Sequence, residues 1–326
     1  MIYVYKTQDL SEKDWHEIVR GFNDSFDRNN SIESMQKYYA ATILGYSYHA
    51  LDYTEDGQLR GYNSIVPTLY DYHGKEILVG ISGGTFVNKE FRKDVFIFKH
   101  LMTALFDYCR QEGMVMKVGV PNKNSFTYAI KINKAKLVGY LNYYILPLKA
   151  FNLLSKPSLR AFNFLSIIFC HIIRLISFCQ STISRNNSRR ATFEIKCDEN
   201  FYNVRFRQRD GYIECTKGRF HGFYKVFKEN DYYAAYIMDY RENEEKTASA
   251  LHYLVGEILR REKQLSAILY VGTINHSQLS LLKVPKRYEP KPLPLTVNVI
   301  NGDDDMEKQA LTLNSWDFGL INFDVR

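Results

Sequence analysis

Apolar residues in the first third of the chain recur first with a helical period and then with a strand period. Residues 10–23 carry Trp15, Ile18 and Phe22 at helical spacing behind a Ser-x-x-Asp start, which predicts an amphipathic helix with a capping box. A second helix is predicted over residues 31–44. Alternating stretches separated by Asp-Gly and His-Gly turns then predict an antiparallel meander of three strands, over residues 46–53, 59–70 and 77–87.

The pattern from Ile77 to Val120 predicts a strand, a polar loop, a helix and a second strand. Residues 77–87 are largely apolar and include Gly80, Gly83 and Gly84. The polar segment 88–94 leads into a helix of about four turns, and residues 114–120 form the second strand. Beyond it, we expect a short helix over residues 128–133 and one long strand over residues 137–148.

The second half of the chain repeats this order more weakly. Residues 232–240 predict a strand, residues 244–263 a helix and residues 267–272 a strand, and segments 118–122 and 271–275 occupy equivalent positions. The fold class expected is a mixed α/β protein (α+β) of two similar domains, each with a mainly antiparallel sheet flanked by helices. These domains are expected at 1–150 and 191–326, joined by a connecting helix within 151–190.

Three stretches around the first strand–helix–strand unit resemble the cofactor-binding core of the GNAT acyltransferase family. Residues 86–92 are similar to the family's strand exit, a Val followed by a polar turn and an aromatic-Arg pair. Residues 101–106 resemble the following helix, and residues 118–125 resemble the next strand and its Asn/Ser-rich exit. The resemblance extends over residues 1–148 in sequence and over 191–326 in architecture alone, as in family members that carry two such domains.

The resemblance implies acyl-CoA, such as acetyl-CoA, as the donor. In the family, the strand exit holds the pantetheine amides, which here implies Phe86 and Val87. The N–H groups of the loop before the helix cradle the pyrophosphate, because a helix N-terminus attracts anions. The loop residues that correspond here are Arg92, Lys93, Asp94, Val95, Phe96, Ile97 and Phe98.

This loop departs from the family pattern in its glycines. Either Val95 or Phe96 stands where the family has Gly, depending on the direction of alignment, and Asp94 adds negative charge beside the expected phosphates. Two interpretations follow. The loop binds CoA through its amides with the help of Arg92 and Lys93, or CoA binding has been lost or replaced by another donor.

Tyr128 and Asn122 are the candidate catalytic residues. Family members often carry a Tyr, in the helix after the second strand, that protonates the leaving thiolate. Ile130 occupies that position here, and Tyr128 lies two residues earlier. Tyr128 is therefore either this acid or a packing residue, and Asn122 either holds substrate or water or serves the turn. The sequence nominates no general base.

Charge and composition narrow the classes of partner. The chain has 326 residues and a net charge of +7, and residues 113–193 contain twelve Lys and Arg but no Asp or Glu. A basic middle suits the phosphates of a coenzyme or nucleotide sugar, or an acidic membrane surface, or is simply solvated. We expect no nucleic-acid partner. The five cysteines and eight histidines lack metal-site spacing, so no metal is expected.

One segment is apolar in its centre and basic at both ends. Residues 161–173 contain no charged side chain, a stretch too short to cross a bilayer, which needs about twenty residues. One interpretation is a helix buried between the two halves or in a homodimer. The other is a peripheral membrane contact through residues 158–182, with arginines on acidic headgroups.

The expected function is transfer of an acyl group from acyl-CoA to an amine in the cytoplasm, at the inner face of the membrane if residues 158–182 contact lipid. Two-domain relatives suggest an amino sugar of surface polysaccharide synthesis, nucleotide-linked or lipid-linked, as the acceptor. Two alternatives remain open. One is a non-catalytic GNAT-like binding protein, and the other is an aminoacyl transferase of the peptidoglycan-branching type, which would use charged tRNA.

Overall fold

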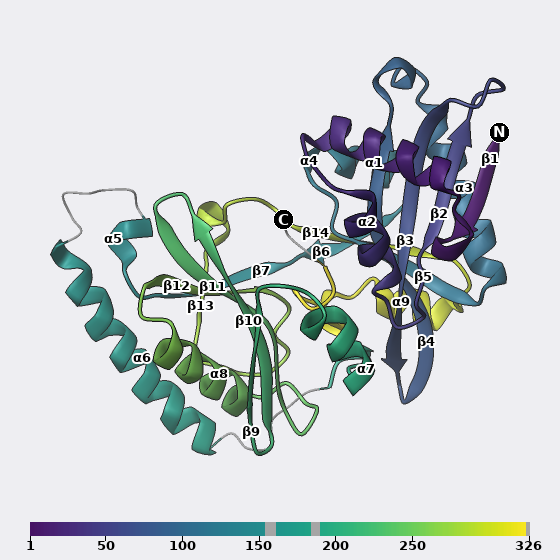
Figure 1. Cartoon of the computed structure of the whole chain (residues 1–326). Helices are drawn as coiled ribbons and strands as arrows, with labels where there is room; N and C mark the ends of the chain where they lie inside the picture. The colour runs from purple at the N-terminus through teal and green to yellow at the C-terminus, as the bar shows by residue number, and fades with distance from the viewer. Residues whose placement is uncertain (154–160, 184–189, 324–326) are drawn as a thin grey trace. The chain divides into compact units, whose positions relative to one another are not determined.

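A computed structural model describes residues 1–153, 161–183 and 190–323 (Figure 1). Its residues gather into two compact units that are discontinuous in sequence. Unit 1 comprises Met1–Tyr140, Asp198–Arg205 and Leu293–Leu313, and unit 2 comprises Leu141–Cys197, Phe206–Pro292 and Asn314–Arg326. The contiguous domains expected at 1–150 and 191–326 are therefore corrected, because each unit contains segments from both halves of the chain. What is described of segment 151–190 belongs to unit 2.

Unit 1 contains a mixed, mainly antiparallel sheet in the order β1-β2-β3-β4-β5-β14-β6 (Figure 1). Only β4 and β5 run parallel, and the other neighbours in this order are antiparallel. The strands are β1 (Ile2–Lys6), β2 (Tyr48–Tyr53), β3 (Leu59–Tyr72), β4 (Lys75–Val87), β5 (Met114–Gly119), β6 (Lys136–Tyr140) and β14 (Pro294–Val299).

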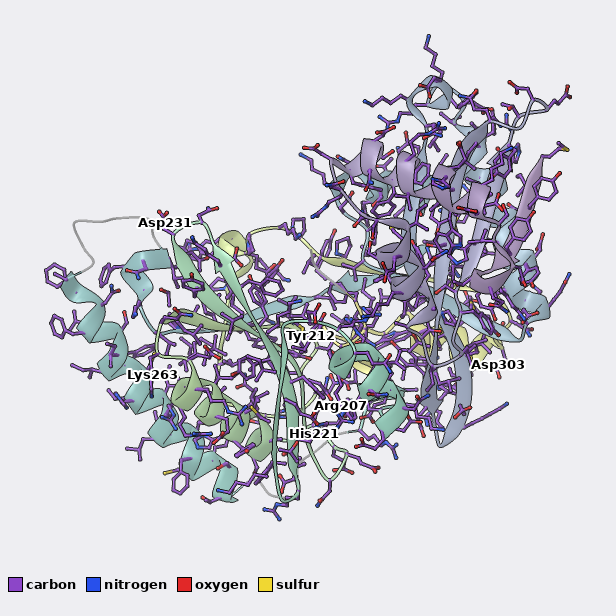
Figure 2. The ribbon with its side chains drawn as sticks, viewed as in Figure 1. Arg207, Tyr212, His221, Asp231, Lys263 and Asp303 are labelled. Carbon is purple, nitrogen blue, oxygen red and sulfur yellow. The ribbon has the colours of Figure 1, made fainter. Side chains whose placement is uncertain are left out.

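Helices pack on both faces of this sheet. On one face, α1 (Glu12–Phe26) and α2 (Ile32–Ala40) form a core with Leu51 and Tyr53. On the other face, α3 (Phe96–Gln111) forms a core with Tyr48 and Ala50. Alternate residues of β2 thus point to opposite faces. The remaining helices are α4 (Lys123–Lys131), α7 (Glu199–Tyr202) and α9 (Asp304–Ala310), whose N-cap is Asp303 (Figure 2).

Unit 2 contains a second mixed sheet in the order β13-β7-β12-β11-β10-β9 (Figure 1). Again one pair is parallel, β11 with β12. The strands are β7 (Asn142–Pro147), β9 (Tyr212–Lys217), β10 (Phe220–Glu229), β11 (Tyr232–Glu242), β12 (Leu265–Gly272) and β13 (Leu282–Lys283), and the short β8 (Phe193–Ile195) and β15 (Trp316–Asp317) pair with each other. The helices are α5 (Ala150–Leu153), α6 (Asn163–Ile183) and α8 (Ala248–Arg261).

The two sheets repeat one plan, which confirms the duplication expected from the sequence. In unit 1 a meander, β2-β3-β4, leads through α3 to the parallel strand β5, and in unit 2 β9-β10-β11 leads through α8 to β12. The next strand in each sheet comes from the other half of the sequence. In the sheet of unit 1, β14 from the second half of the sequence lies next to β5. In the sheet of unit 2, β7 from the first half lies next to β12. The two halves therefore exchange one strand each.

This exchange corrects the single strand predicted over residues 137–148. The stretch is interrupted at Leu141, with β6 in the sheet of unit 1 and β7 in the sheet of unit 2. Alternation of apolar residues shows which side chains are buried, but it does not identify the neighbouring strand.

Local predictions are otherwise close to the structure, with some omissions. Ser11 and Asp14 form the expected capping box of α1. Strand β1 was not predicted, and neither were β9 and β10, which begin at Tyr212 and end before the turn at Asp231 (Figure 2). Helix α4 begins at Lys123 rather than Tyr128, because Asn122 caps it.

Candidate functional site

The pairing between the parallel strands β4 and β5 stops before β4 ends. Their pairing ends at Ile81 and Val118, whereas β4 continues to Val87 against β3. A β-bulge lies just beyond the end of the pairing with β5, because Gly83 and Gly84 together stand opposite the single residue Ser64. A bulge bends its strand and increases the local twist. Residues 82–87 of β4 are therefore paired with β3 on one side and with no described strand on the other; we call this unpaired edge the opening.

The two bulge glycines are required by close packing. A Cβ atom on Gly83 would lie 2.3 Å from Ser64 Oγ, and one on Gly84 would lie 2.5 Å from Phe22 Cε2. Both distances are far below a normal contact, so a larger residue at either position would push the neighbouring strand or helix α1 away. The glycines of this strand thus shape the opening.

Helix α3 begins beside this opening without a conventional cap. Its N-cap residue, Val95, makes no side-chain cap hydrogen bond. Instead, Asp94 Oδ1 accepts a hydrogen bond from the Phe96 N–H at 2.9 Å. The first N–H groups of a helix lack partners within it and attract negative charge. The Asp94 carboxylate therefore already accepts a hydrogen bond from one of the N–H groups that a bound phosphate would need.

The two basic residues of the loop differ in their contacts. The Arg92 Nε–H donates to the Val87 carbonyl oxygen at 3.0 Å, and Arg92 Nη2 lies 3.4 Å from Ser25 Oγ. Arg92 therefore fastens the loop to the end of β4. Lys93 is exposed, and its ammonium group is available to an anion from solvent.

The apolar residues predicted for this site divide into core and surface positions. Phe86 and Ile97 are buried, and Phe86 stacks on Tyr62 with ring centroids 5.4 Å apart. Val87 is half-buried, whereas Val95 and Phe96 are 47% and 58% exposed. These two residues therefore form a small exposed apolar surface at the start of α3.

Tyr128 and Asn122, both on or next to α4, occupy different environments. The rings of Tyr128 and Phe98 meet edge to face with centroids 5.9 Å apart, so the structure brings Tyr128 to the first turn of α3. Tyr128 is 45% exposed, and its role as an acid remains a prediction. The Asn122 side-chain oxygen accepts from the N–H groups of Asn124 and Ser125, both at 2.9 Å. Asn122 is thus the N-cap of α4, and a contact with substrate remains a prediction.

Lys117 on β5 was not recognised from the sequence. Its side chain is 9% exposed, and among the described residues no hydrogen bond or ion pair holds its amine. Burial lowers the pKa of Lys117 to about 8. A lysine within the apolar run Met-Val-Met-Lys-Val-Gly was the available signal, since an unpaired lysine is rarely buried without a purpose.

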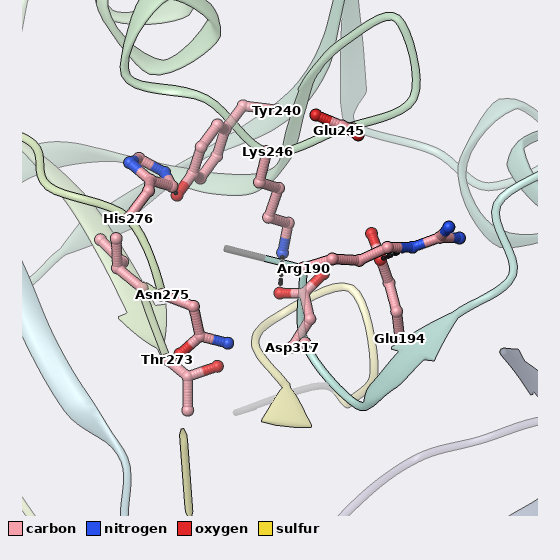
Figure 3. A pocket seen from close by; sticks show the side chains of 11 residues that line it. Arg190, Glu194, Tyr240, Glu245, Lys246, Thr273, Asn275, His276 and Asp317 are labelled. Carbon is pink, nitrogen blue, oxygen red and sulfur yellow. Dashed lines mark hydrogen bonds and ion pairs between the residues drawn. The ribbon is translucent and has the colours of Figure 1, made fainter. Parts of the chain in front are cut away.

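The corresponding region of unit 2 is a pocket filled with charged groups (Figure 3). It lies where β11 and β12 end and α8 begins, which corresponds to the opening beside α3 in unit 1. Thr247 caps α8 in the conventional manner, because its Oγ1 accepts from the Ala250 N–H. Lys246 Nζ lies 2.6 Å from Asp317 Oδ1 (Figure 3).

The charges of this pocket neutralise one another. Arg241, which is 4% exposed, contacts Glu194 at 2.8 Å and Asp239 at 3.0 Å. Burial alone would lower the pKa of Lys246, but the charges of Asp317 and Asp239 outweigh it and raise this pKa. Buried charges persist when they are paired in this way. We interpret the cluster as a structural substitute for a ligand site.

The described residues contain no group of three or more His, Cys, Asp or Glu side chains arranged to hold a metal ion. One described helix, Asn163–Thr182 within α6, is long and apolar enough to cross a membrane by length and composition.

Comparison with known proteins places the N-terminal region in a family. Residues 6–130 match the model of the acetyltransferase (GNAT) domain. A search of curated proteins gave no match.

Solved structures share the fold of the chain at low sequence identity. A probable N-acyltransferase from Enterococcus faecalis V583 is 12% identical, with a TM-score of 0.57, over 92% of this chain and 73% of that one. A GCN5-related N-acetyltransferase from Kribbella flavida is 10% identical, with a TM-score of 0.59, over 92% and 72%. Saccharomyces cerevisiae N-myristoyltransferase with bound myristoyl-CoA is 8% identical, with a TM-score of 0.51, over 96% and 88%.

The solved structures share the fold of this chain over most of its length. Residues 6–130 form a GNAT domain. The recognition made from the sequence is therefore confirmed, as is the fold class of two mainly antiparallel sheets flanked by helices.

Proposed function

We propose that the protein transfers an acyl group from acyl-CoA to an amine, with the donor held by unit 1. The unpaired edge of β4 beyond Ile81, followed along the chain by the uncapped start of α3, is the observation that carries the proposal. On that edge the backbone groups of residues 82–87 have no described strand partner, and in our proposal they bond the amides of the pantetheine arm. Acetyl-CoA is the simplest donor for such a site.

The phosphates of the donor would lie at the start of α3. The helix dipole and the first N–H groups favour an anion there. Lys93 supplies a positive charge, and Arg92 does so if its guanidinium leaves the Val87 oxygen. Asp94 opposes the phosphates and would have to release the Phe96 N–H, so we expect weak binding of CoA compared with a glycine-rich loop.

The chemistry needs a proton acceptor for the amine and a proton donor for the thiolate. The amine nitrogen attacks the thioester carbonyl carbon, the C–S bond breaks, and the CoA thiolate takes up a proton. Tyr128 is the candidate for that last step, because it lies against Phe98 at the first turn of α3. A phenol within hydrogen-bond reach of the sulfur can donate its proton to the leaving thiolate.

The acceptor proposed is an amino sugar, linked to a nucleotide or a lipid, in the cytoplasm. The basic composition of residues 113–193 supports a phosphate-bearing acceptor. This part of the proposal rests on analogy with two-domain acyltransferases and on charge, and on no contact in the structure.

Calorimetry with CoA and acetyl-CoA tests the donor site. Replacing Arg92 and Lys93 together by Ala should weaken binding by about five- to thirtyfold, or about 1–2 kcal/mol, as expected for charge-assisted contacts at an exposed site. The matched control replaces two exposed cations at the end of α8, Arg260 and Lys263, and should leave binding unchanged. An equal effect of both pairs would remove the loop as the phosphate site.

One observation favours a second function, that of a non-catalytic GNAT-like binding protein. The Asp94 carboxylate already accepts from the Phe96 N–H that a phosphate would use. If millimolar CoA shows no binding heat, this alternative replaces the enzyme. Binding of charged tRNA in place of CoA would instead indicate an aminoacyl transferase.

A further inference from the structure

Helix α6 in unit 2 turns a mostly polar face towards the rest of the unit and an apolar face outward. The residues that pack against the rest of the unit recur every three or four positions and are mostly polar or small: Ser166, Cys170, Ile173 and Ser177. The outward residues are large and apolar, each between 44% and 65% exposed: Phe164, Leu165, Ile168, Phe169, Ile172 and Leu175. A helix at the surface of a globular domain normally shows the opposite arrangement.

The polar stripe is held by unit 2 along the length of the helix, beside α8 (Figure 1). Near its start, Ser166 Oγ accepts from the Ala150 N–H at 3.2 Å. In the second half, Ser177 Oγ lies 3.0 Å from His252 Nδ1. Near its end, Gln180 Nε2 donates to Ser277 Oγ at 3.0 Å. Crossing a bilayer would transfer these groups from their partners into hydrocarbon, which is costly. The docked helix therefore lies along a surface and does not span.

The exposed apolar face is too large to be ordinary surface. The helix of 21 residues is roughly 30 Å long at 1.5 Å per residue. Side chains project from its outer side along the whole length (Figure 2). An uninterrupted apolar patch of more than a few hundred Å² marks a binding surface in a soluble domain.

The charges in and around the helix point to an anionic occupant. Residues 149–193 contain seven Lys and Arg and no Asp or Glu. Two of them have contacts within the unit, because Arg174 Nη2 would lie 3.4 Å from a Cβ atom on Gly256 of α8 and Arg190 pairs with Glu194. The other five flank α6 in the sequence. A second copy of this chain would fit poorly, because a two-fold interface through α6 would bring these like charges together. A membrane with acidic headgroups satisfies both the apolar face and the cations.

We propose that the outer face of α6 binds an anionic lipid bilayer, with the helix lying in the interface. Its apolar side chains enter the region between headgroups and acyl chains, and the polar stripe remains hydrogen-bonded to unit 2. This proposal is independent of the acyltransferase activity, because it concerns only unit 2.

Co-sedimentation of the full chain with vesicles tests the proposal. Binding to phosphatidylcholine–phosphatidylglycerol vesicles should exceed binding to phosphatidylcholine alone. The variant Ile168→Glu/Leu175→Glu should lower the partition coefficient by about tenfold or more, since it introduces charge into an apolar contact. The matched control, Leu282→Glu/Tyr288→Glu, adds the same charge at exposed apolar positions elsewhere in unit 2 and should lose little binding.

A fluorescent residue separates insertion from mere attraction. Both natural tryptophans, Trp15 and Trp316, are buried, so Phe169→Trp would introduce an exposed probe. Lipids brominated on their acyl chains should quench this tryptophan. No quenching, or equal binding of wild type and the α6 variant, would overturn the proposal. A wild-type dimer in sedimentation equilibrium that the α6 variant converts to monomer would also overturn it, by showing a second copy on this face.

Discussion

The starts of helices α3 and α8 occupy the same position in two copies of one plan, yet they are completed differently. At α8, Thr247 caps the helix and a network of buried charges fills the space beside it. At α3, the N-cap Val95 offers no cap, and exposed Lys93, Val95 and Phe96 border the opening. The chain's own side chains thus complete the start of α8, whereas the start of α3 is left without a side-chain cap at Val95. The difference lies in a few side chains and not in the backbone plan.

Of the substitutions considered below, removal of the Arg241 guanidinium from the charged network of unit 2 should change the stability of the protein most. Arg241→Met leaves buried Asp239 with the more distant Lys246 Nζ, 3.7 Å away, and leaves Glu194 with Arg190. We expect the free energy of unfolding to fall by about 3–5 kcal/mol. Urea denaturation followed by circular dichroism measures this loss. The control Arg260→Met removes an exposed pair with Glu257 and should produce no measurable change. A small effect of Arg241→Met would show that the network is not structural and would reopen this pocket as a ligand site.

Lys117 provides the next test of the difference between the two units, because the residue at the equivalent position of unit 2 has a hydrogen-bond partner for its polar group. Aligning the sequence around Val118 with that around Val271 makes Tyr270 the equivalent of Lys117. Tyr270 is buried, and its hydroxyl donates to the Thr273 carbonyl. The folded-state pKa of Lys117, about 8, lies below its ordinary value of 10.5. The charged amine therefore destabilises the fold at neutral pH, by about 1.4 kcal/mol for each unit of the shift.

Lys117→Met should accordingly stabilise the protein by about 2–4 kcal/mol at pH 7. The unfolded chain holds this proton more tightly, so wild-type stability should rise between pH 8 and 10.5, and the advantage of the variant should shrink over that window. Denaturation curves at several pH values measure it. A destabilised variant would mean that the amine has a partner, and an active-site role would then become the better explanation.

A substitution at Asp94 should have the smallest effect, and it tests the start of α3 alone. In Asp94→Asn the side-chain oxygen can still accept from the Phe96 N–H, while the charge that opposes phosphate is removed. CoA should bind about fivefold more tightly at low salt, or about 1 kcal/mol, as measured by calorimetry. Asp107→Asn removes a charge farther along the same helix and is the control. Unchanged affinity for CoA in the Asp94 variant would show that the charge of this carboxylate does not oppose the donor.

The sequence predicted the parts of the fold that depend on short-range periodicity. The helix at 96–111 and the strands around it have strong patterns, and the Ser11–Asp14 capping box depends on spacing alone. The interruption at Leu141 could not be predicted, because strand neighbours are chosen by contacts far along the chain.

The candidate site shows the same division. Its loop was located correctly in relation to the helix, and the charge of Asp94 was recognised as unfavourable for phosphate. That Asp94 would bond the Phe96 amide and that Arg92 would bond Val87 depended on backbone geometry, which residue types do not specify. Asn122 was assigned to the strand exit, and its side chain caps α4 because the helix begins earlier than the apolar pattern indicated.

The exchange of β7 and β14 has a consequence for biosynthesis. When the ribosome has released residues 1–140, β6 has no neighbour in its sheet and the outer edge of β5 is bare, since β14 is made of residues 294–299. Unpaired edges of this kind invite association with other chains. The first sheet therefore stays open until residues 294–299 have emerged, which makes its completion dependent on a segment synthesised long after its other strands.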